Sequence, residues 1–392
     1  MGPLNGIRVL DLSKYGPSRY CSLILADLGA EVIVVEMPKT GGQVIDVVAD
    51  DVGSLYLAHN RNKKSIALNL RKEKGKEVFY RLVERVDVVI EANRPGVLKR
   101  RGMDYETVSK LNPQLVYCSI TGYGQDGPYA QRTGHEINFA GITGVMALTG
   151  SRNGPPVYLQ SPSIADLLGG VTHAAIAIIA ALFARNTIGK GQYIDVSITD
   201  GAVFYHWIDG QQYLLDGTLP QRAEMPTGSD MACMNVYLAK DGKYFTVGCA
   251  EPWLWTKFCR LAGREDFVPH QFDPVDKQKE MYDALSEVFA TRERDEWVRL
   301  LNEADISAAP VYGFDELFTD PHFSYRNVLV EVEHPKRGRI RLLNTPFRFS
   351  ATPAEVRTRP PLWGEHTREV LGDVLGYTEE QLHSLFAEGV IE

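Results

Sequence analysis

Two titratable side chains stand at the starts of apolar segments, where each could do acid/base chemistry. His135 lies in GHEINFAGITG (134–144), and Asp166 lies at the start of ADLLGGVTHAAIAIIAALF (165–183). Histidine has an unperturbed pKa of about 6.5, so it can take or give a proton near neutral pH. A carboxyl group in an apolar setting has a raised pKa and can do the same. Two such groups could move a proton on and off one substrate.

Both residues also have structural explanations. A lone histidine beside an apolar run is usually part of the packing. Asp166 follows Ser163 at the spacing of a capping box, and an aspartate at a helix start normally caps the helix or interacts with its dipole. From the residues alone, these structural roles are the default.

Composition restricts the class of protein. The chain has 392 residues, 44% of them hydrophobic and 23% charged, which is enough for two globular domains. The formal net charge of -8 argues against a general nucleic-acid binder, which needs a basic surface. The five cysteines show no C-x-x-C spacing, and the nine histidines form no H-x-x-x-H pair, so we expect no disulfide framework and no metal site.

The sequence shows no targeting signal. The N-terminus lacks the basic and apolar regions of a secretory signal. The longest apolar run, at 174–184, is shorter than the roughly 20 residues that cross a bilayer, so we interpret it as a buried helix. We therefore expect a cytoplasmic protein without membrane or nucleic-acid partners.

Strand and helix patterns alternate through the first part of the chain, as in a parallel α/β sheet. A long helix apolar nearly all round is predicted over 163–185, with Ser163 as its cap, and helices of this kind often pack against a second subunit. Turn-forming residues at 215–235 indicate a boundary. Beyond it we expect a hairpin turning on Asp241-Gly242 and helices over 253–262 and 277–305.

A dinucleotide site is the first alternative for such a sheet. Glu36 ends the second predicted strand, as the ribose-binding acid does in nicotinamide dehydrogenases. The three-glycine fingerprint that the pyrophosphate requires is missing, because LSKYGPSRYC (12–21) supplies only Gly16. The dehydrogenase interpretation is therefore not favoured.

Eight segments in order resemble the family III CoA-transferases, and more narrowly their alpha-methylacyl-CoA racemase branch. The resemblance spans nearly the whole chain and rests on LADLGAEVIVVE (25–36), NRNKKSIALNL (60–70), NRPGVLKRRGM (93–103), SITGYGQDGPY (119–129), GHEIN (134–138), ADLLGG (165–170), GKGQYIDVSITDG (189–201) and VGCAEPWLW (247–255).

The resemblance implies an α/β fold of two domains and an interlocked homodimer. Residues 1–200 and 313–392 would form a large, Rossmann-like open-sheet domain that binds CoA, and residues 225–312 a smaller α+β domain. The apolar helix at 163–185 and the proline-rich tail both need a partner surface, which such a dimer would supply.

The resemblance also implies the chemistry. In the racemase branch, the residues matching His135 and Asp166 are the catalytic pair that inverts the carbon next to a thioester. In the transferases, the matching aspartate attacks the thioester and forms a mixed anhydride. Transferases do not generally carry histidine at position 135, which favours the racemase. The racemase pattern usually has Asp after the histidine and a tyrosine near residue 139, whereas this chain has Glu136 and Phe139.

Further site residues follow from the same resemblance. Arg94 and Glu251 match polar positions of the racemase site, with Glu251 expected to hydrogen-bond His135. Asn60, Arg71 and Arg100 match the CoA cleft. For the enolate oxygen, we expect backbone N–H donors at the start of the helix that carries Asp166. The pair Gly169-Gly170 would let either substrate or a packing partner come close.

The sequence therefore predicts an acyl-CoA racemase or epimerase without a separate cofactor, CoA being part of the substrate. A CoA-transferase that uses Asp166 as nucleophile is the first alternative. A CoA-binding protein that has lost catalysis is the second. The acyl group is not identified by the sequence.

Overall fold

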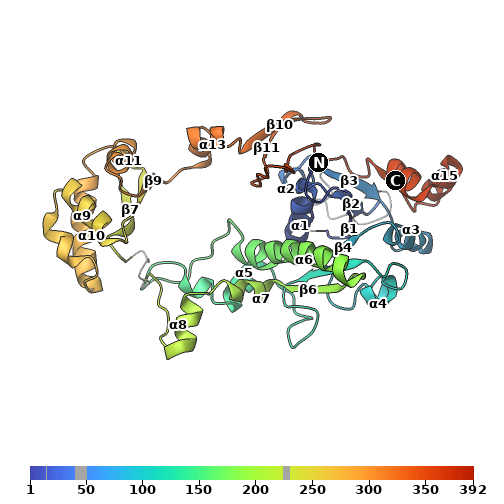
Figure 1. The fold of residues 1–392 in the computed structure, drawn as a ribbon, viewed down its shortest axis with the longest axis horizontal. Helices are drawn as coiled ribbons and strands as arrows, with labels where there is room; N and C mark the ends of the chain where they lie inside the picture. Colours follow the sequence, from blue (N-terminus) through green and yellow to red (C-terminus); the bar gives the residue numbers. More distant parts are fainter. Residues whose placement is uncertain (15, 40–50, 224–229) are drawn as a thin grey trace. The chain divides into compact units, whose positions relative to one another are not determined.

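The chain folds into two compact units (Figure 1). The computed structural model describes residues 1–392 apart from 15, 40–50 and 224–229. Unit 1 comprises residues 1–143, 160–205 and 322–392, and unit 2 comprises residues 144–159 and 206–321.

A six-stranded parallel sheet forms the centre of unit 1, in the order β3-β2-β1-β4-β5-β6. Strands β2 and β4 are mainly apolar and buried, as expected where both faces of a sheet are covered. The strands of the sheet are β1 (Arg8–Asp11), β2 (Glu31–Glu36), β3 (Lys63–Ala67), β4 (Val88–Glu91), β5 (Val116–Thr121) and β6 (Tyr193–Ser197). The expected open α/β sheet is confirmed, and the strand order reverses between β1 and β4.

Helices cover both faces of this sheet. On one face, Leu10 of β1 and Val89 of β4 lie in a cluster with apolar side chains from α3, α14 and α15. Their neighbours Val9 and Val88 are also buried but lie outside that cluster, because successive strand residues point to opposite faces. Helices α1 and α6 contact the sheet as well. The helices are α1 (Gly16–Asp27), α3 (Glu73–Val83), α6 (His173–Ile188), α14 (Thr367–Leu375) and α15 (Glu379–Ala387).

The apolar helix differs from its prediction in its start and in its burial. It begins as a π-helical turn, η4 (Ala165–Thr172), and continues directly as α6. Phe183 is 78% and Ile176 58% exposed, so one side of α6 is uncovered in the single chain. By length and composition, the stretch Ala165–Ile188 is apolar enough to cross a membrane, but core helices of water-soluble proteins pass the same test.

The C-terminal segment runs along β3, at the edge of the sheet. Asn62 bonds this segment just before β3: its Oδ1 accepts hydrogen bonds from the N–H groups of Arg357 (2.6 Å) and Thr358 (2.9 Å). Farther on, the Ser65 Oγ accepts the N–H of Gly364 at 2.8 Å. Residues 68 and 391 form a β-bridge. The predicted proline-rich arm thus covers an edge strand, which keeps that strand from pairing with other chains.

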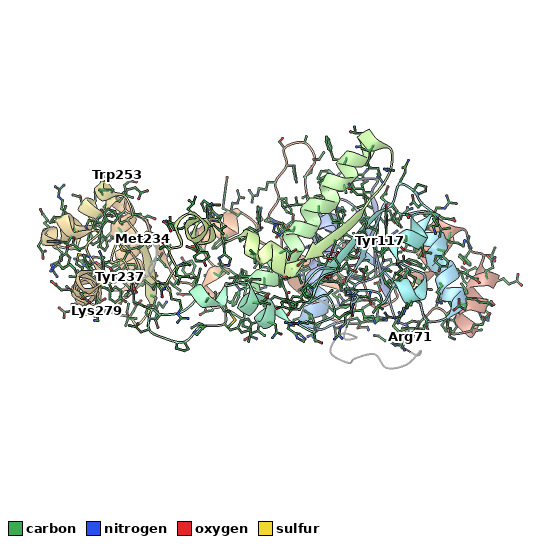
Figure 2. The ribbon with its side chains drawn as sticks, turned by 90° about the horizontal axis from the view of Figure 1, so that it is seen from below. Arg71, Tyr117, Met234, Tyr237, Trp253 and Lys279 are labelled. Carbon is green, nitrogen blue, oxygen red and sulfur yellow. The ribbon has the colours of Figure 1, made fainter. Side chains whose placement is uncertain are left out.

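Unit 2 is built on a three-stranded antiparallel sheet of order β7-β8-β9. The predicted hairpin is confirmed, and it turns at Gly242, whose φ is 76°. Tyr237 lies in an aromatic core, whereas Trp253 is exposed (Figure 2). The elements are β7 (Met234–Leu238), β8 (Tyr244–Gly248), β9 (Ala308–Pro310), α8 (Asp209–Asp216), α9 (Pro252–Leu261), α10 (Val275–Phe289) and α11 (Arg294–Glu303).

The boundaries of one helical stretch differ from the sequence prediction. Residues 277–305 were expected as one helical stretch but form α10 and α11, separated by a short turn. Between β4 and β5, the chain forms the 3-10 turn η2 (Lys99–Arg101) and the short helix α4 (Tyr105–Val108). A two-stranded antiparallel sheet pairs β10 (Leu329–His334) with β11 (Gly338–Leu343).

Candidate active site

A cavity of about 760 Å³ lies at the carboxyl ends of β1, β4 and β5. Its walls include the segments that follow these strands, namely 12–14, 92–95 and 121–123. In open α/β sheets, ligands bind at the carboxyl ends of the strands where the strand order reverses. The reversal here falls between β1 and β4, so the fold directs us to this cavity.

His135, Asp166 and Arg94 all line this cavity. His135 directly precedes α5 (Glu136–Ile142), and its backbone N–H donates to the Asn138 Oδ1 at 3.1 Å. Its side chain is exposed. The structure therefore brings together residues that are 41 and 31 positions apart in the sequence.

Asp166 lies in the first turn of η4 and is half-buried. Burial raises the pKa of its carboxyl group to about 7, and the negative charge of Glu136 contributes to the rise. A carboxyl group with this pKa exists in both protonation states near neutrality, which suits it to proton transfer. π-helical turns are rare and frequently occur at functional sites.

Glu136 holds the start of η4. Its carboxylate is 7% exposed and accepts hydrogen bonds from the N–H groups of Ala165 (3.0 Å) and Asp166 (2.6 Å). These two N–H groups are therefore occupied, which corrects our expectation that they would bind an enolate oxygen. Ser163, the predicted cap, makes no side-chain cap, because Glu136 takes that role from another helix.

Glycines let η4 pack directly against α7 (Ile198–Phe204). A Cβ added to Gly201 would lie 2.0 Å from the carbonyl oxygen of Gly169, and one added to Gly169 would lie 2.4 Å from the oxygen of Ile198. On the same turn, the Nδ1 of His173 lies 3.0 Å from the Gly169 oxygen. Of the two uses considered for Gly169, the structure shows close helix packing.

The wall next to His135 is apolar. Phe139 is buried, and its ring lies against Gly122 and Gly134, where an added Cβ would approach the ring to 2.4 Å. Tyr123 packs edge-to-face on Phe139, with a centroid distance of 5.3 Å. Phe139, near which the family pattern usually has tyrosine, thus contributes an aromatic surface without a hydroxyl group.

Cationic side chains line the cavity on another side. Arg94 follows β4, and its Nη2 donates to the Thr133 Oγ1 at 2.9 Å. Lys14 follows β1; burial lowers its pKa, and the positive charges of Arg101 and Arg71 lower it further. Arg71 therefore lies close enough to act on a cavity residue, whereas Arg100 is exposed on η2. Lys14 was not among the predicted site residues, although its position after the first strand could have indicated it.

Two predicted residues lie elsewhere. Asn60 is 1% exposed and does not line the cavity. Its Nδ2 donates to the backbone carbonyl oxygen of Tyr56 at 3.0 Å. Glu251 precedes α9 in unit 2 and is exposed, so its expected bond to His135 stays a prediction. The five cysteines are buried and free. Outside the gaps at 15, 40–50 and 224–229, no group of three or more His, Cys, Asp or Glu could hold a metal ion.

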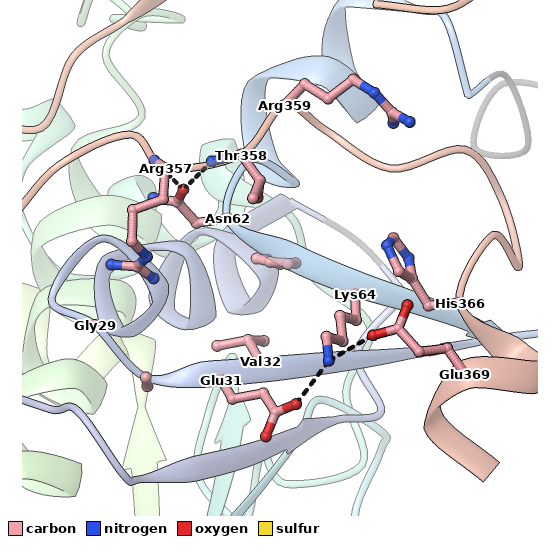
Figure 3. Close-up of a pocket in the computed structure, with 12 residues that line it drawn as sticks. Gly29, Glu31, Val32, Asn62, Lys64, Arg357, Thr358, Arg359, His366 and Glu369 are labelled. Carbon is pink, nitrogen blue, oxygen red and sulfur yellow. Dashed lines mark hydrogen bonds and ion pairs between the residues drawn. The ribbon is translucent and has the colours of Figure 1, made fainter. Parts of the chain in front are cut away.

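A second cavity, of about 630 Å³, lies at the opposite end of β2 and β3 (Figure 3). There the Lys64 Nζ bonds both Glu31 (3.0 Å) and Glu369 (2.8 Å). Arg359 pairs with Glu365 beside it. The Lys64–Glu369 contact ties the C-terminal segment to the sheet, and the ion pairs leave Lys64 and Arg359 already neutralised.

Comparison with known proteins is consistent across the chain. A model of CoA-transferase family III matches residues 4–367. Human succinyl-CoA:glutarate CoA-transferase is 32% identical, covering 100% of this chain and 90% of its own. Human alpha-methylacyl-CoA racemase is also 32% identical, and the match covers 99% of this chain and 97% of the racemase. The crystal structure of a CAIB/BAIF family protein from Brucella suis matches with a TM-score of 0.82 and 31% identity, over 95% of this chain and 99% of that one.

Proposed function

Because the chain belongs to CoA-transferase family III, we propose that it is an acyl-CoA racemase or epimerase. It would invert the carbon next to the thioester of a 2-methyl or related 2-substituted acyl-CoA. The observation that carries this proposal is that a histidine and a carboxyl group with a pKa of about 7 line one cavity at the sheet's switch point.

The reaction needs two groups that work in sequence. In one direction, neutral His135 takes the α-proton, and the electron pair of the broken C–H bond forms an enolate with the thioester carbonyl. Protonated Asp166 then gives a proton to the other face, and the enolate collapses to the inverted thioester. In the other direction, Asp166 is the base and the imidazolium is the acid. The raised pKa of Asp166 supports both directions.

Charged residues of the same cavity support binding of a CoA ester. Lys14, with Arg71 and Arg101 near it, provides a positive region for the phosphates. Arg94 would orient a carboxylate or screen the enolate charge. Asn60 and Arg100 remain proposed CoA contacts on the resemblance alone. Glu251 is proposed to hydrogen-bond His135.

A CoA-transferase is the second candidate, because several relatives are named as such. Besides the human glutarate enzyme, a succinyl-CoA--D-citramalate CoA-transferase of Chloroflexus aurantiacus is 33% identical over 99% of this chain. In that reaction, ionised Asp166 attacks the thioester carbonyl and expels CoA as thiolate, leaving a mixed anhydride. A nucleophile must be ionised, and a pKa of about 7 leaves about half of the Asp166 carboxyl groups ionised at neutral pH, so this pKa permits both reactions.

Deuterium exchange separates the two candidates. In heavy water, a racemase puts deuterium on the α-carbon of a branched acyl-CoA without any acceptor acid, and His135→Ala should slow this at least 100-fold. A transferase requires an acceptor acid, and hydroxylamine should trap its intermediate at Asp166. Transfer without exchange would overturn the racemase proposal. Retained CoA binding with neither reaction would favour a protein that has lost catalysis.

We also propose that the chain acts as an interlocked homodimer in the cytoplasm. The exposed apolar side of α6, which carries Ile176 and Phe183, supports a second copy as its cover. The buried, free cysteines suit a reducing compartment.

A further inference from the structure

Glu136 links the two helices that carry the proposed acid/base pair. It follows His135 directly in the chain, and its two carboxylate oxygens accept the N–H groups of Ala165 and Asp166. We infer that Glu136 is a positioning residue that fixes the backbone of Asp166 and favours the protonated form of its carboxyl group. What Asp166 then does rests on the proposed function, whereas the link itself does not.

Two hydrogen bonds hold the Glu136 carboxylate at the start of η4. Each oxygen takes one N–H donor, at 3.0 and 2.6 Å, and both donors belong to the start of a helix. Backbone N–H groups at a helix start stabilise a carboxylate more than a carboxylic acid. Glu136 is also 7% exposed, so its charge is poorly screened by water.

Asp166 therefore faces a fixed negative charge. Burial is the main cause of the raised pKa of Asp166, and the negative charge of Glu136 is the second cause. Two neighbouring carboxyl groups rarely both ionise in a partly buried site. A proton is thus held where the proposed reaction needs an acid. The other charged or titratable groups that line this cavity or stand on the helices packed against η4 are Lys14, Arg19, Tyr20, Cys21, Asp27, Arg94, Tyr123, Arg132, His135, His173, Arg185 and Asp200.

The length of the side chain matters for this role. The resemblance to the racemase branch would place Asp at this position, and Glu is one methylene longer. Shortening Glu136 to Asp withdraws the carboxylate by about 1.5 Å, which is too far to keep both bonds. Glu136→Gln keeps the length but removes the charge, and its amide N–H₂ then meets a backbone donor. The two variants thus separate charge from reach.

The direct test is the pH dependence of carbodiimide coupling at Asp166, read by peptide mass spectrometry on the full chain without substrate. Coupling follows the protonated carboxyl group, and exposed carboxyl groups in the same digest serve as the reference. In the unaltered protein we expect a midpoint near 7. Glu136→Gln should lower it by about one unit. Glu136→Asp should shift it less, because the charge remains.

Glu73→Gln is the matched control, since Glu73 is an exposed residue of α3 paired with Lys76. It should leave the Asp166 midpoint unchanged. A Glu136→Gln protein that melts normally and keeps the unaltered midpoint would overturn the inference. If the Glu136→Gln variant does not fold, hydrogen exchange of the peptide 163–172 is measured in Glu136→Asp instead. Unchanged protection of that peptide would also overturn the inference.

Turnover distinguishes this inference from the proposed function. If the protein racemises, Glu136→Gln should lower kcat at least 10-fold, leave KM within 2-fold, and move the kcat pH profile in the same direction as the coupling midpoint. If no substrate exchanges deuterium or transfers CoA, the proposed function fails. The coupling midpoint still tests Glu136 in that case.

Discussion

Replacing Gly201 by alanine should misplace Asp166, because the added methyl group would push against the backbone of η4. The added Cβ would lie 2.0 Å from the carbonyl oxygen of Gly169, whereas Cβ atoms essentially never come within 3.0 Å of another atom. The two helices must therefore separate by about 1 Å. Overpacking of this kind costs about 1–3 kcal/mol. A reacting group displaced by about 1 Å loses roughly 100-fold in rate.

Two assays read this prediction. Thermal unfolding followed by circular dichroism should show a Tm about 5 °C lower, given about 2–4 °C per kcal/mol in a domain of this size. Deuterium incorporation into acyl-CoA should fall about 100-fold in kcat. Activity should fall more than occupancy of the CoA site, because the cationic residues of the cavity are on other elements.

Gly372→Ala is the matched control. Gly372 is within α14, and the nearest atom to an added Cβ is the Tyr377 oxygen at 4.0 Å. Alanine in a helix interior is favoured over glycine by about 0.5–1 kcal/mol, so this variant should melt at the same or a higher temperature with full activity. A Gly201→Ala protein that melts within 1 °C of the unaltered one and exchanges deuterium normally would refute the packing argument.

Four further outcomes are expected. The pKa of Asp166 is about 7 in the folded protein, against an ordinary value of 3.8. Between these pH values the folded protein holds a proton that the unfolded chain has released, so the free energy of unfolding falls as pH rises. Asp166→Asn should therefore raise Tm more at pH 8 than at pH 4 in calorimetry. Arg94→Lys loses the planar donor to Thr133 and should lower kcat/KM about 10-fold in steady-state kinetics. Phe183→Glu should halve the mass seen by light scattering if α6 forms the dimer interface. Glu251→Gln should reduce kcat if this residue bonds His135.

The sheet of unit 1 was predictable because its inner strands are buried on both faces. The segment AEVIVVE (30–36) is apolar apart from Glu31 and Glu36, and this pattern with intervening amphipathic segments indicates parallel strands and crossover helices. Helix limits were less accurate, because ends depend on contacts that the local pattern does not contain. The turn that separates α10 from α11 is one example.

The start of η4 shows why part of the site could not be derived from spacing. Ser163 lies at the position of a local cap, yet the N–H groups of the helix bond Glu136, about 30 residues earlier. Such a partner is visible only after the chain has folded. Lys14 is different, since cavity residues of open sheets follow the strands, and its place after β1 was available in the sequence.

The route of the C-terminal segment has a consequence for biosynthesis. β3 is complete once residue 67 has been made, but the groups that cover its edge come about 300 residues later, as in the bond from the Ala67 N–H to the Thr367 Oγ1. Contacts of such long sequence separation form slowly. Residues 206–321 emerge from the ribosome in the meantime and have their own core. Unit 2 should therefore become compact first. The edge of β3 in unit 1 stays uncovered until the C-terminal segment has been synthesised. During this interval the nascent polypeptide most needs a chaperone.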